Sequence, residues 1–235
     1  PFDESALALN RPNISDSENG LLVLEKTTGG IRGFDKKQYK DIESLQDNKA
    51  PSEEEANAIL RNHGKELSAL EKAVKKEFLV PRGKSYKEHV FNFRDLRYIA
   101  DAELILARRD FKNNDVESAI KRVDIATAAG SKTQSSRGGF LSLVLGSSFL
   151  RKSIETTNAA IDAKDLPVKV FPRMIKIIDP EKTRANAIEA MKEEYHSTKL
   201  LMREAAASQR KPISRQIEKG IFKPNISDKY FYTLF

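Results

Sequence analysis

The stretch from Arg94 to Gly130 constrains the fold most strongly, because it predicts two α-helices folded back on each other. The first helix contains the run LRYIADAELILARRDF and the second the run VESAIKRVDIATAAG, with an Asn-Asn-Asp turn between them. Ala119, Val123 and Ala126 place small or medium apolar side chains on one face of the second helix. Such residues let two helices pack closely. The pattern therefore predicts a helical hairpin, and it says little about chemistry.

A second signal begins at Ser52, where the sequence Ser-Glu-Glu-Glu matches a capping box. In this motif the serine hydroxyl and the third glutamate each satisfy a backbone N–H group at the start of a helix. Apolar residues and one histidine then recur at steps of four and three: Ala56, Leu60, His63, Leu67, Leu70, Val74 and Phe78. We expect a helix from Ser52 to about Val80 that buries this row and ends before Pro81.

A Gly/Ser-rich turn from Gly130 to Gly139 precedes a predicted long helix from about Phe140 to Ala163. Its first half is apolar on most faces, so we expect that half to be central. An N-cap followed by proline at Asp179-Pro180 predicts a further helix through Ala207. One face of that helix carries Ala185, Ile188, Met191, Tyr195 and Met202.

Weaker signals lie elsewhere in the chain. Asp16 or Ser17 is expected to cap a short helix over Leu21–Lys26, and another short helix is expected over Pro172–Ile178. At 235 residues the chain can bury a sizeable core, and no strong domain boundary is visible. The sequence predicts an all-α fold: one domain, residues 1–235, of about six to eight helices packed as irregular antiparallel hairpins, with irregular segments at 1–50 and 208–235.

Composition argues against several kinds of chemistry. The chain has no Cys, which removes disulfides, thiolate metal sites and cysteine nucleophiles, and it has only three His. The single Glu-x-x-His, from Glu193 to His196, is half of what a carboxylate-bridged metal site in a helical bundle needs. The longest apolar run, residues 138–146, is too short to span a bilayer. We therefore predict no metal, no cofactor and no enzyme.

Charge is spread unevenly, which can signal an anionic partner or let the two ends of one domain lie against each other. The net charge is +7, but residues 1–55 carry 7 basic and 12 acidic groups, whereas residues 199–235 carry 8 basic and 3 acidic groups. The candidate binding residues are Arg108, Arg109, Arg122, Arg137, Lys223 and Asn225. Two interpretations stay open. The chain binds a protein or peptide in a groove between helices, or it binds an anionic polymer, nucleic acid or membrane surface through its basic C-terminal third.

The hairpin at 94–130 is similar to a single tetratricopeptide repeat, because Ala119, Val123 and Ala126 fall where that repeat places the packing residues of its second helix. Ser131 stands where the repeat usually has proline, and no second copy follows at the 34-residue period of such repeats. The similarity implies a TPR-like hairpin and does not extend to a repeat array.

Three short motifs resemble a loose group of uncharacterised bacterial all-helical envelope proteins, exported or membrane-anchored. The motifs are Ser17–Gly20, Ala107–Asp110 and Phe222–Ser227. The resemblance implies a non-enzymatic interaction or structural domain of the bacterial cell envelope, periplasmic or extracytoplasmic. Because the chain begins at Pro1, we expect a processed form whose signal or membrane anchor has been removed. We also expect the first and last of these motifs to lie near each other.

Overall fold

The structure is a computed structural model that describes residues 7–9, 11–28, 42–45, 49–81, 91, 93–162 and 180–218. These residues form six α-helices and no β-strand, which confirms the predicted all-α class and the expected number of helices. Within the same residues, one isolated parallel bridge joins Asn19 and Glu77.

The predicted hairpin is confirmed as α4 (Phe93–Lys112) and α5 (Val116–Gln134). In the turn, Asn114 takes a left-handed conformation with φ 59°, which asparagine tolerates better than most residues. Asp115 then caps α5 by accepting a hydrogen bond of 3.2 Å from the backbone N–H of Ser118. This cap fixes where the second helix begins.

Helix α5 ends at Gln134 and not at Gly130, so the predicted Gly/Ser-rich turn is shorter than expected. The reason is that Gly130 lies inside the helix, where it allows the next helix to pack closely on α5. A Cβ atom added at Gly146 of the next helix would lie 2.5 Å from the Gly130 carbonyl oxygen. The two glycines therefore let α5 and its neighbour approach backbone to backbone.

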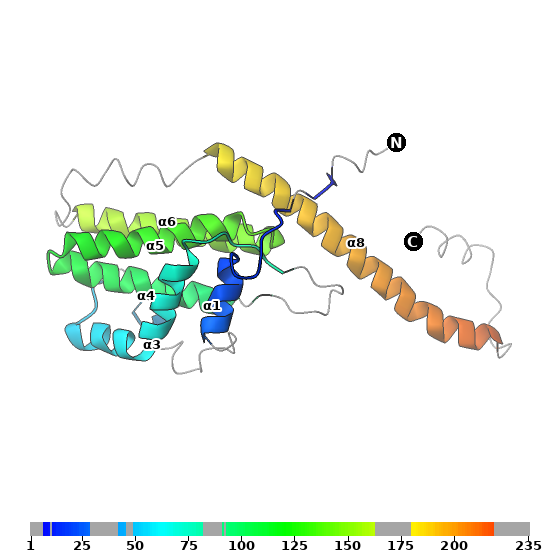
Figure 1. The fold of residues 1–235 in the computed structure, drawn as a ribbon, viewed down its shortest axis with the longest axis horizontal. Helices are drawn as coiled ribbons and strands as arrows, with labels where there is room; N and C mark the ends of the chain where they lie inside the picture. Colours follow the sequence, from blue (N-terminus) through cyan, green and yellow to red (C-terminus); the bar gives the residue numbers. More distant parts are fainter. Residues whose placement is uncertain are drawn as a thin grey trace.

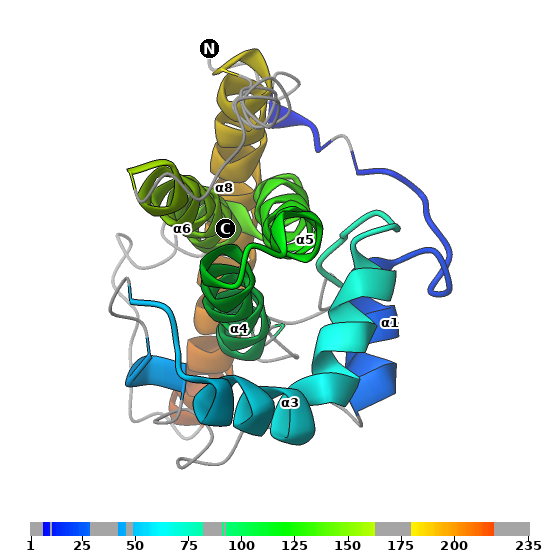
Figure 2. The same ribbon diagram turned by 90° about the vertical axis from the view of Figure 1, so that its left-hand side faces the viewer.

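Helices α4, α5 and α6 (Gly139–Asp162) run alongside one another as a three-helix bundle (Figures 1 and 2). Helix α3 (Glu53–Ala73) crosses α4, and α1 (Gly20–Thr28) packs on α3. The main core lies where these elements meet, and its fully buried side chains include Leu21, Leu24, Ile42, Leu70, Leu96, Ile99, Ile105 and Leu106.

The capping box at the start of α3 is confirmed, with Ser52 and Glu55 bonding each other's backbone N–H groups. The predicted row is buried at Ala56, His63, Leu67, Leu70 and Phe78 and half-buried at Leu60 and Val74. The predicted end near Val80 is wrong, because α3 stops at Ala73.

A tertiary contact explains why α3 ends early. The buried Asn19 side chain donates to the Leu79 carbonyl (2.7 Å) and accepts from the Leu79 N–H (3.1 Å). The Gly20 N–H donates to the Glu77 carbonyl at 2.7 Å. Residues 77–79 are thus held in a non-helical conformation against the start of α1. Asn19 also accepts from the Leu21 N–H, so Asn19, and not Asp16 or Ser17, bonds the first turn of α1.

The bounds predicted for α6 agree with the structure, but the expectation that its first half is central is wrong. Phe140, Leu141 and Val144 are exposed. The inward face instead carries mostly small residues, namely Gly146, Ser142, Ser153, Thr156, Thr157 and Ala160, together with Phe149. The close approach of α5 explains this arrangement, because only small side chains fit between two helices that meet at glycines.

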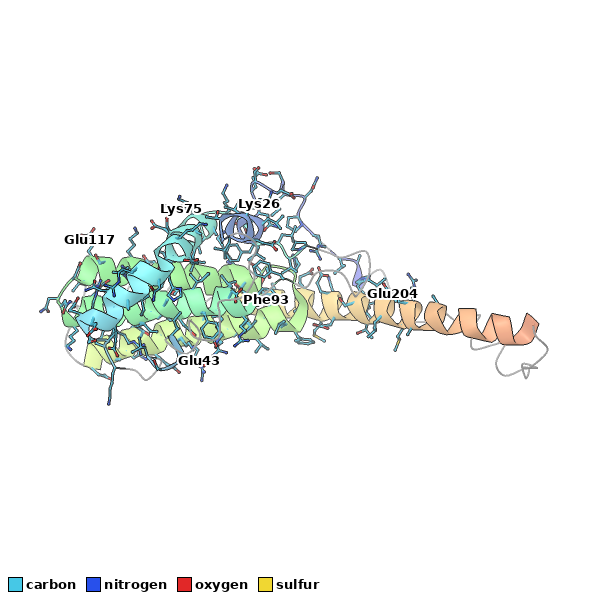
Figure 3. The ribbon with its side chains drawn as sticks, turned by 90° about the horizontal axis from the view of Figure 1, so that it is seen from below. Lys26, Glu43, Lys75, Phe93, Glu117 and Glu204 are labelled. Carbon is cyan, nitrogen blue, oxygen red and sulfur yellow. The ribbon has the colours of Figure 1, made fainter. Side chains whose placement is uncertain are left out.

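Helix α8 (Pro180–Glu218) begins at the predicted proline, but it runs to Glu218 and not to Ala207. Part of the segment predicted to be irregular, residues 208–218, is therefore helical, and Pro212 lies inside it. Helix α8 packs on α6 and extends past the end of the bundle (Figures 1 and 3). The predicted helix at 172–178 and the Phe222–Ser227 motif lie outside the described residues.

Candidate functional site

Helix α4 runs through the middle of the protein and yet buries four carboxylates, of which Asp95 lies in its first turn. Asp101, Glu103 and Asp110 are each no more than 3% exposed. Lys152 of α6 donates to Asp101 at 2.7 Å. Arg122 of α5 donates to Glu103 at 2.7 Å and to Asp110 at 2.8 Å. These partners allow the carboxylates to be buried, since a lone buried charge is very costly.

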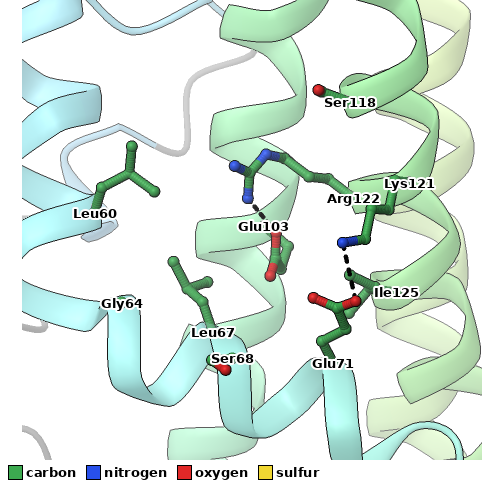
Figure 4. A pocket seen from close by; sticks show the side chains of 10 residues that line it. All are labelled: Leu60, Gly64, Leu67, Ser68, Glu71, Glu103, Ser118, Lys121, Arg122 and Ile125. Carbon is green, nitrogen blue, oxygen red and sulfur yellow. Dashed lines mark hydrogen bonds and ion pairs between the residues drawn. The ribbon is translucent and has the colours of Figure 1, made fainter.

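A groove of about 280 Å³ lies beside this buried network, between α3 and α5 and above α4 (Figure 4). Helices α3 and α5 both pack on α4 but touch each other little, which leaves the space between them open. The groove is lined by Leu60, Gly64, Leu67, Ser68 and Glu71 of α3, Glu103 of α4, and Ser118, Lys121, Arg122 and Ile125 of α5.

The groove has an apolar part and a gap in one wall. Leu60, Leu67 and Ile125 supply aliphatic surface. On α3, a Cβ atom added at Gly64 would meet nothing within 4 Å. The absence of a side chain at Gly64 thus leaves that part of the groove free for another molecule. The serine hydroxyls of Ser68 and Ser118 stand nearby as hydrogen-bonding groups.

The groove also holds two ion pairs of different character. Lys121 and Glu71 pair at 2.9 Å across the rim, and more than half of the Lys121 side chain is exposed. The hydrogen bond from Lys121 lowers the pKa of the Glu71 carboxyl. Below them, burial raises the pKa of Glu103 even though Arg122 opposes the shift. The rim pair can exchange partners with a ligand, whereas the Glu103–Arg122 pair is part of the core.

The structure places the predicted binding residues Arg108 and Arg109 against internal acceptors. Arg108 is buried, and its guanidinium donates to the Leu45 carbonyl at 2.7 Å. Arg109 donates to the neighbouring Asp110 carboxylate at 2.8 Å. Neither arginine lines the groove.

Arg122 lines the groove, as described above, while Arg137 lies elsewhere and pairs with Glu189 of α8 at 2.7 Å. The structure therefore does not bring the four arginines together at one surface. Lys223 and Asn225 lie outside the described residues.

A smaller opening of about 70 Å³ lies between α4 and α6. Asp101, Arg108, Lys152, Glu155 and Thr156 contribute its polar lining. Lys152 Nζ contacts both Asp101 carboxylate oxygens there, at 2.7 and 2.8 Å. This opening is too small for a substrate-sized molecule and is filled at its edge by that ion pair.

The Glu-x-x-His pair of α8 contacts the N-terminal segment. Glu193 is buried and pairs with Arg11 at 2.9 Å. His196 Nε2 lies 2.9 Å from the Leu7 carbonyl oxygen. Across the described part of the chain, no group of three or more His, Asp or Glu side chains is arranged to hold a metal ion. In the same residues, no helix is long and apolar enough to cross a membrane.

Sequence reasoning found Arg122 but missed its acidic partners and Lys121 beside it. Glu103 and Asp110 are seven residues apart, which is about two helical turns, so they share one face of α4. Arg122 lies across the hairpin from both. An arginine opposite two carboxylates in a predicted hairpin is a signal that could have identified this network.

Comparisons with known proteins identify no relative. No protein-family model matches the chain, no curated protein matches it, and no solved structure matches it.

Proposed function

We propose that the protein is a non-enzymatic interaction module that binds a peptide segment of a partner protein in the groove between α3 and α5. The observation that supports this most directly is the groove itself, with aliphatic walls, two serine hydroxyls and a wall opened by Gly64. Its volume of about 280 Å³ suits a few side chains. Binding sites commonly combine an apolar lining with a small number of polar groups in this way.

The rim pair indicates what such a peptide carries. An aliphatic side chain would occupy the surface of Leu60, Leu67 and Ile125. Glu71 and Lys121 lie at the edge of the same groove, and they pair with each other when no peptide is bound. A charged peptide residue beside the aliphatic one can take the place of Glu71 or of Lys121 in this ion pair. Breaking the original pair costs little free energy, because Lys121 is largely exposed. The preferred ligand is therefore a short segment with adjacent aliphatic and charged residues.

A displayed library of random peptides tests the proposal. Peptides enriched on the full chain would be measured for affinity against the wild type and the variant Gly64→Phe. A Cβ atom at position 64 meets nothing within 4 Å, so the substitution adds a ring to the groove lining without a clash at its Cβ. We expect Gly64→Phe to weaken binding at least about tenfold, equivalent to about 1.4 kcal/mol.

Two control variants accompany the blocked groove. Gly64→Ala changes helix propensity without filling the space, and Asn62→Phe adds the same ring at an exposed position of α3 outside the groove lining. Both are expected to bind like the wild type. A library that yields no enriched peptide, or peptides that bind Gly64→Phe as tightly as the wild type, would contradict the proposal.

The proposed location is the bacterial cell envelope, and it is supported by the resemblance of the short motifs described above. Fractionation of cells that express the native gene tests it. Recovery of the protein in the cytoplasmic fraction alone would contradict the proposed location. It would not contradict the proposal that a peptide binds in the groove.

A further inference from the structure

Arg122 of α5 is held in the groove by two of its three guanidinium nitrogens. Its Nε donates to Asp110 at 2.8 Å, and its Nη1 donates to Glu103 at 2.7 Å. The third nitrogen, Nη2, has no hydrogen-bond partner among the residues that the structure describes. The Arg122 side chain is 20% exposed, and its guanidinium points from α5 toward α3 (Figure 4). Nη2 is therefore a fixed donor that can contact a molecule bound in the groove.

This fixed donor sets a requirement for any ligand of the groove. A peptide that fills the groove removes water from Nη2, and a buried donor without an acceptor costs free energy. The peptide therefore has to place an oxygen atom against Nη2. A carboxylate oxygen is the most favourable acceptor, because hydrogen bonds that involve ionised groups are stronger than those between neutral groups. Since Asp110 and Glu103 already hold the guanidinium, Arg122 loses little conformational freedom when the peptide binds.

The ion pairs at the rim of the groove also favour an anionic ligand. Lys121 Nζ lies 2.9 Å from Glu71, which is its only acidic partner in the described part of the chain. Glu71 has a second partner on its own helix, Lys75, at 3.7 Å. A peptide carboxylate can thus bind Lys121 while Glu71 keeps Lys75. A peptide cation that bound Glu71 would instead leave Lys121 without a partner.

We infer that the groove is selective for an acidic peptide residue, an aspartate or glutamate next to an aliphatic side chain, and this inference rests on the proposed function. The carboxylate contacts Nη2 of Arg122 and the ammonium group of Lys121. The Ser118 hydroxyl lines the same wall and can donate a further hydrogen bond. The aliphatic neighbour lies against Leu67 and Ile125. The groove thus distinguishes partner segments by the sign of their charge.

Three displayed peptide libraries test this selectivity on the full chain. Each has a fixed leucine within random sequence, followed by an acidic residue, by its amide or by a basic residue. We expect the acidic library to yield peptides that Gly64→Phe weakens, and replacing their acidic residue by its amide should weaken binding at least about tenfold. Peptides without an acidic residue that bind equally well and are weakened by Gly64→Phe would overturn the selectivity but keep the proposed function. The absence of any binding peptide would overturn both.

Two variants of the rim should act in opposite directions on an acidic peptide. Lys121→Gln removes a cation that contacts the peptide and should weaken binding up to about fivefold. Glu71→Gln removes the competitor for Lys121 and should strengthen binding about two- to fivefold. The matched control is Lys75→Gln, which removes the other partner of Glu71 outside the groove lining and should bind within about twofold of the wild type. Effects of reversed sign would show that the groove prefers a basic residue.

The contribution of Arg122 is measured with Arg122→Lys. Lysine keeps a positive charge near Glu103 and Asp110 but lacks the planar fork that presents Nη2. Binding should fall at least about tenfold for an acidic peptide and less than about twofold for its amide counterpart. NMR of the wild type with labelled arginine gives a second test that does not depend on the folding of the variant. The Arg122 Nη2 signal should shift more with the acidic peptide than with its amide, and equal responses to the two peptides would overturn the assignment.

Discussion

Helices α4 and α6 belong to the same three-helix bundle, but they bury opposite kinds of residues. Helix α4 buries Asp101, Glu103 and Asp110 in the middle of the protein. Helix α6 exposes Phe140 and Val144, while Ser142, Ser153, Thr156 and Thr157 face inward. In both helices the polarity of a side chain is a poor guide to whether that side chain is buried.

The two helices satisfy their buried polar groups in different ways. The carboxylates Asp101, Glu103 and Asp110 pair with Lys152 of α6 and Arg122 of α5. Asp101 and Asp110 also pair with arginines of α4 itself, Arg97 and Arg109. The α6 hydroxyls depend on their own helix. Ser153 donates to the Phe149 carbonyl at 3.0 Å, and Thr157 donates to the Ser153 carbonyl at 2.8 Å.

This difference shows what determines burial in each helix. In α4 a charged side chain is buried where a partner of opposite charge reaches it from a neighbour. In α6 a side chain beside the contact of Gly130 with Gly146 is buried only where it is small enough for the close approach of α5. Each rule makes a separate prediction about substitutions, and the two can be tested independently.

The largest effect is expected from Arg122→Ala. The substitution leaves Glu103 buried without Arg122 and leaves Asp110 with Arg109 alone, which should lower the free energy of unfolding by about 3–5 kcal/mol. Urea denaturation measures this loss. The control is Arg151→Ala, whose exposed pair with Glu155 at 3.7 Å should contribute less than about 0.5 kcal/mol. Equal losses in the two variants would show that the pairing does not permit the burial in α4.

A smaller loss is expected from Gly146→Ala, which tests the size rule of α6. The added methyl would lie 2.5 Å from the Gly130 carbonyl oxygen and 2.7 Å from the Gln134 backbone nitrogen. Relief of this overlap should cost about 1–3 kcal/mol of stability. The matched control is Gly64→Ala, which meets open space and should stabilise α3 by about 0.5–1 kcal/mol. A neutral Gly146→Ala would mean that α5 and α6 are not held so closely.

The pH dependence of stability separates buried from exposed carboxylates. Burial raises the pKa of Glu103 above its ordinary 4.5, so between the two values the folded state holds more protons than the unfolded state. The stability contributed by Glu103 is therefore lost as pH rises through that range. We expect Glu103→Gln to lose less stability than the wild type between pH 4.5 and the raised pKa. Urea denaturation at a series of pH values measures the slope, and an unchanged slope would contradict the assignment.

Glu55 provides the opposite case for the same measurement. The backbone and side chain of Ser52 donate hydrogen bonds that lower the pKa of Glu55. Its contribution is present above pH 4.5 and is lost as pH falls through the lowered pKa. Glu55→Gln should therefore reduce the loss of unfolding free energy as pH falls below 4.5. Above pH 4.5 the pH dependence of the unfolding free energy should stay the same as in the wild type.

Local signals in the sequence predicted most helix starts. The capping box at Ser52 and the Asn-Asn-Asp turn act through neighbouring backbone groups, and both mark real helix boundaries. The proline at 180 also begins a helix, as predicted. The end of α3 could not be predicted in this way. It depends on Asn19, which lies far away in the sequence and holds the backbone of Leu79.

The candidate site was only partly visible in the sequence for a related reason. The sequence indicated Arg122 as a binding residue, but Glu71 and Lys121 form a rim only because α3 crosses the hairpin. The crossing position of a helix depends on the whole core and not on a local motif. The expectation that the first half of α6 is central failed in the same way, because the closeness of α5 decided which face turned inward.

The smallest effect is expected on the outer face of α6. Leu141→Gln and Val144→Gln together remove two apolar side chains that already contact water, and glutamine is a good helix former. The free energy of unfolding should therefore change by less than about 0.5 kcal/mol in urea. Phe149→Ala, on the inward face of the same helix, should cost about 3–5 kcal/mol because Phe149 is almost fully buried. If the double variant instead lost as much as Phe149→Ala, the outer face of α6 would have to be covered in solution. The contrast with α4 would then rest on the buried carboxylates alone.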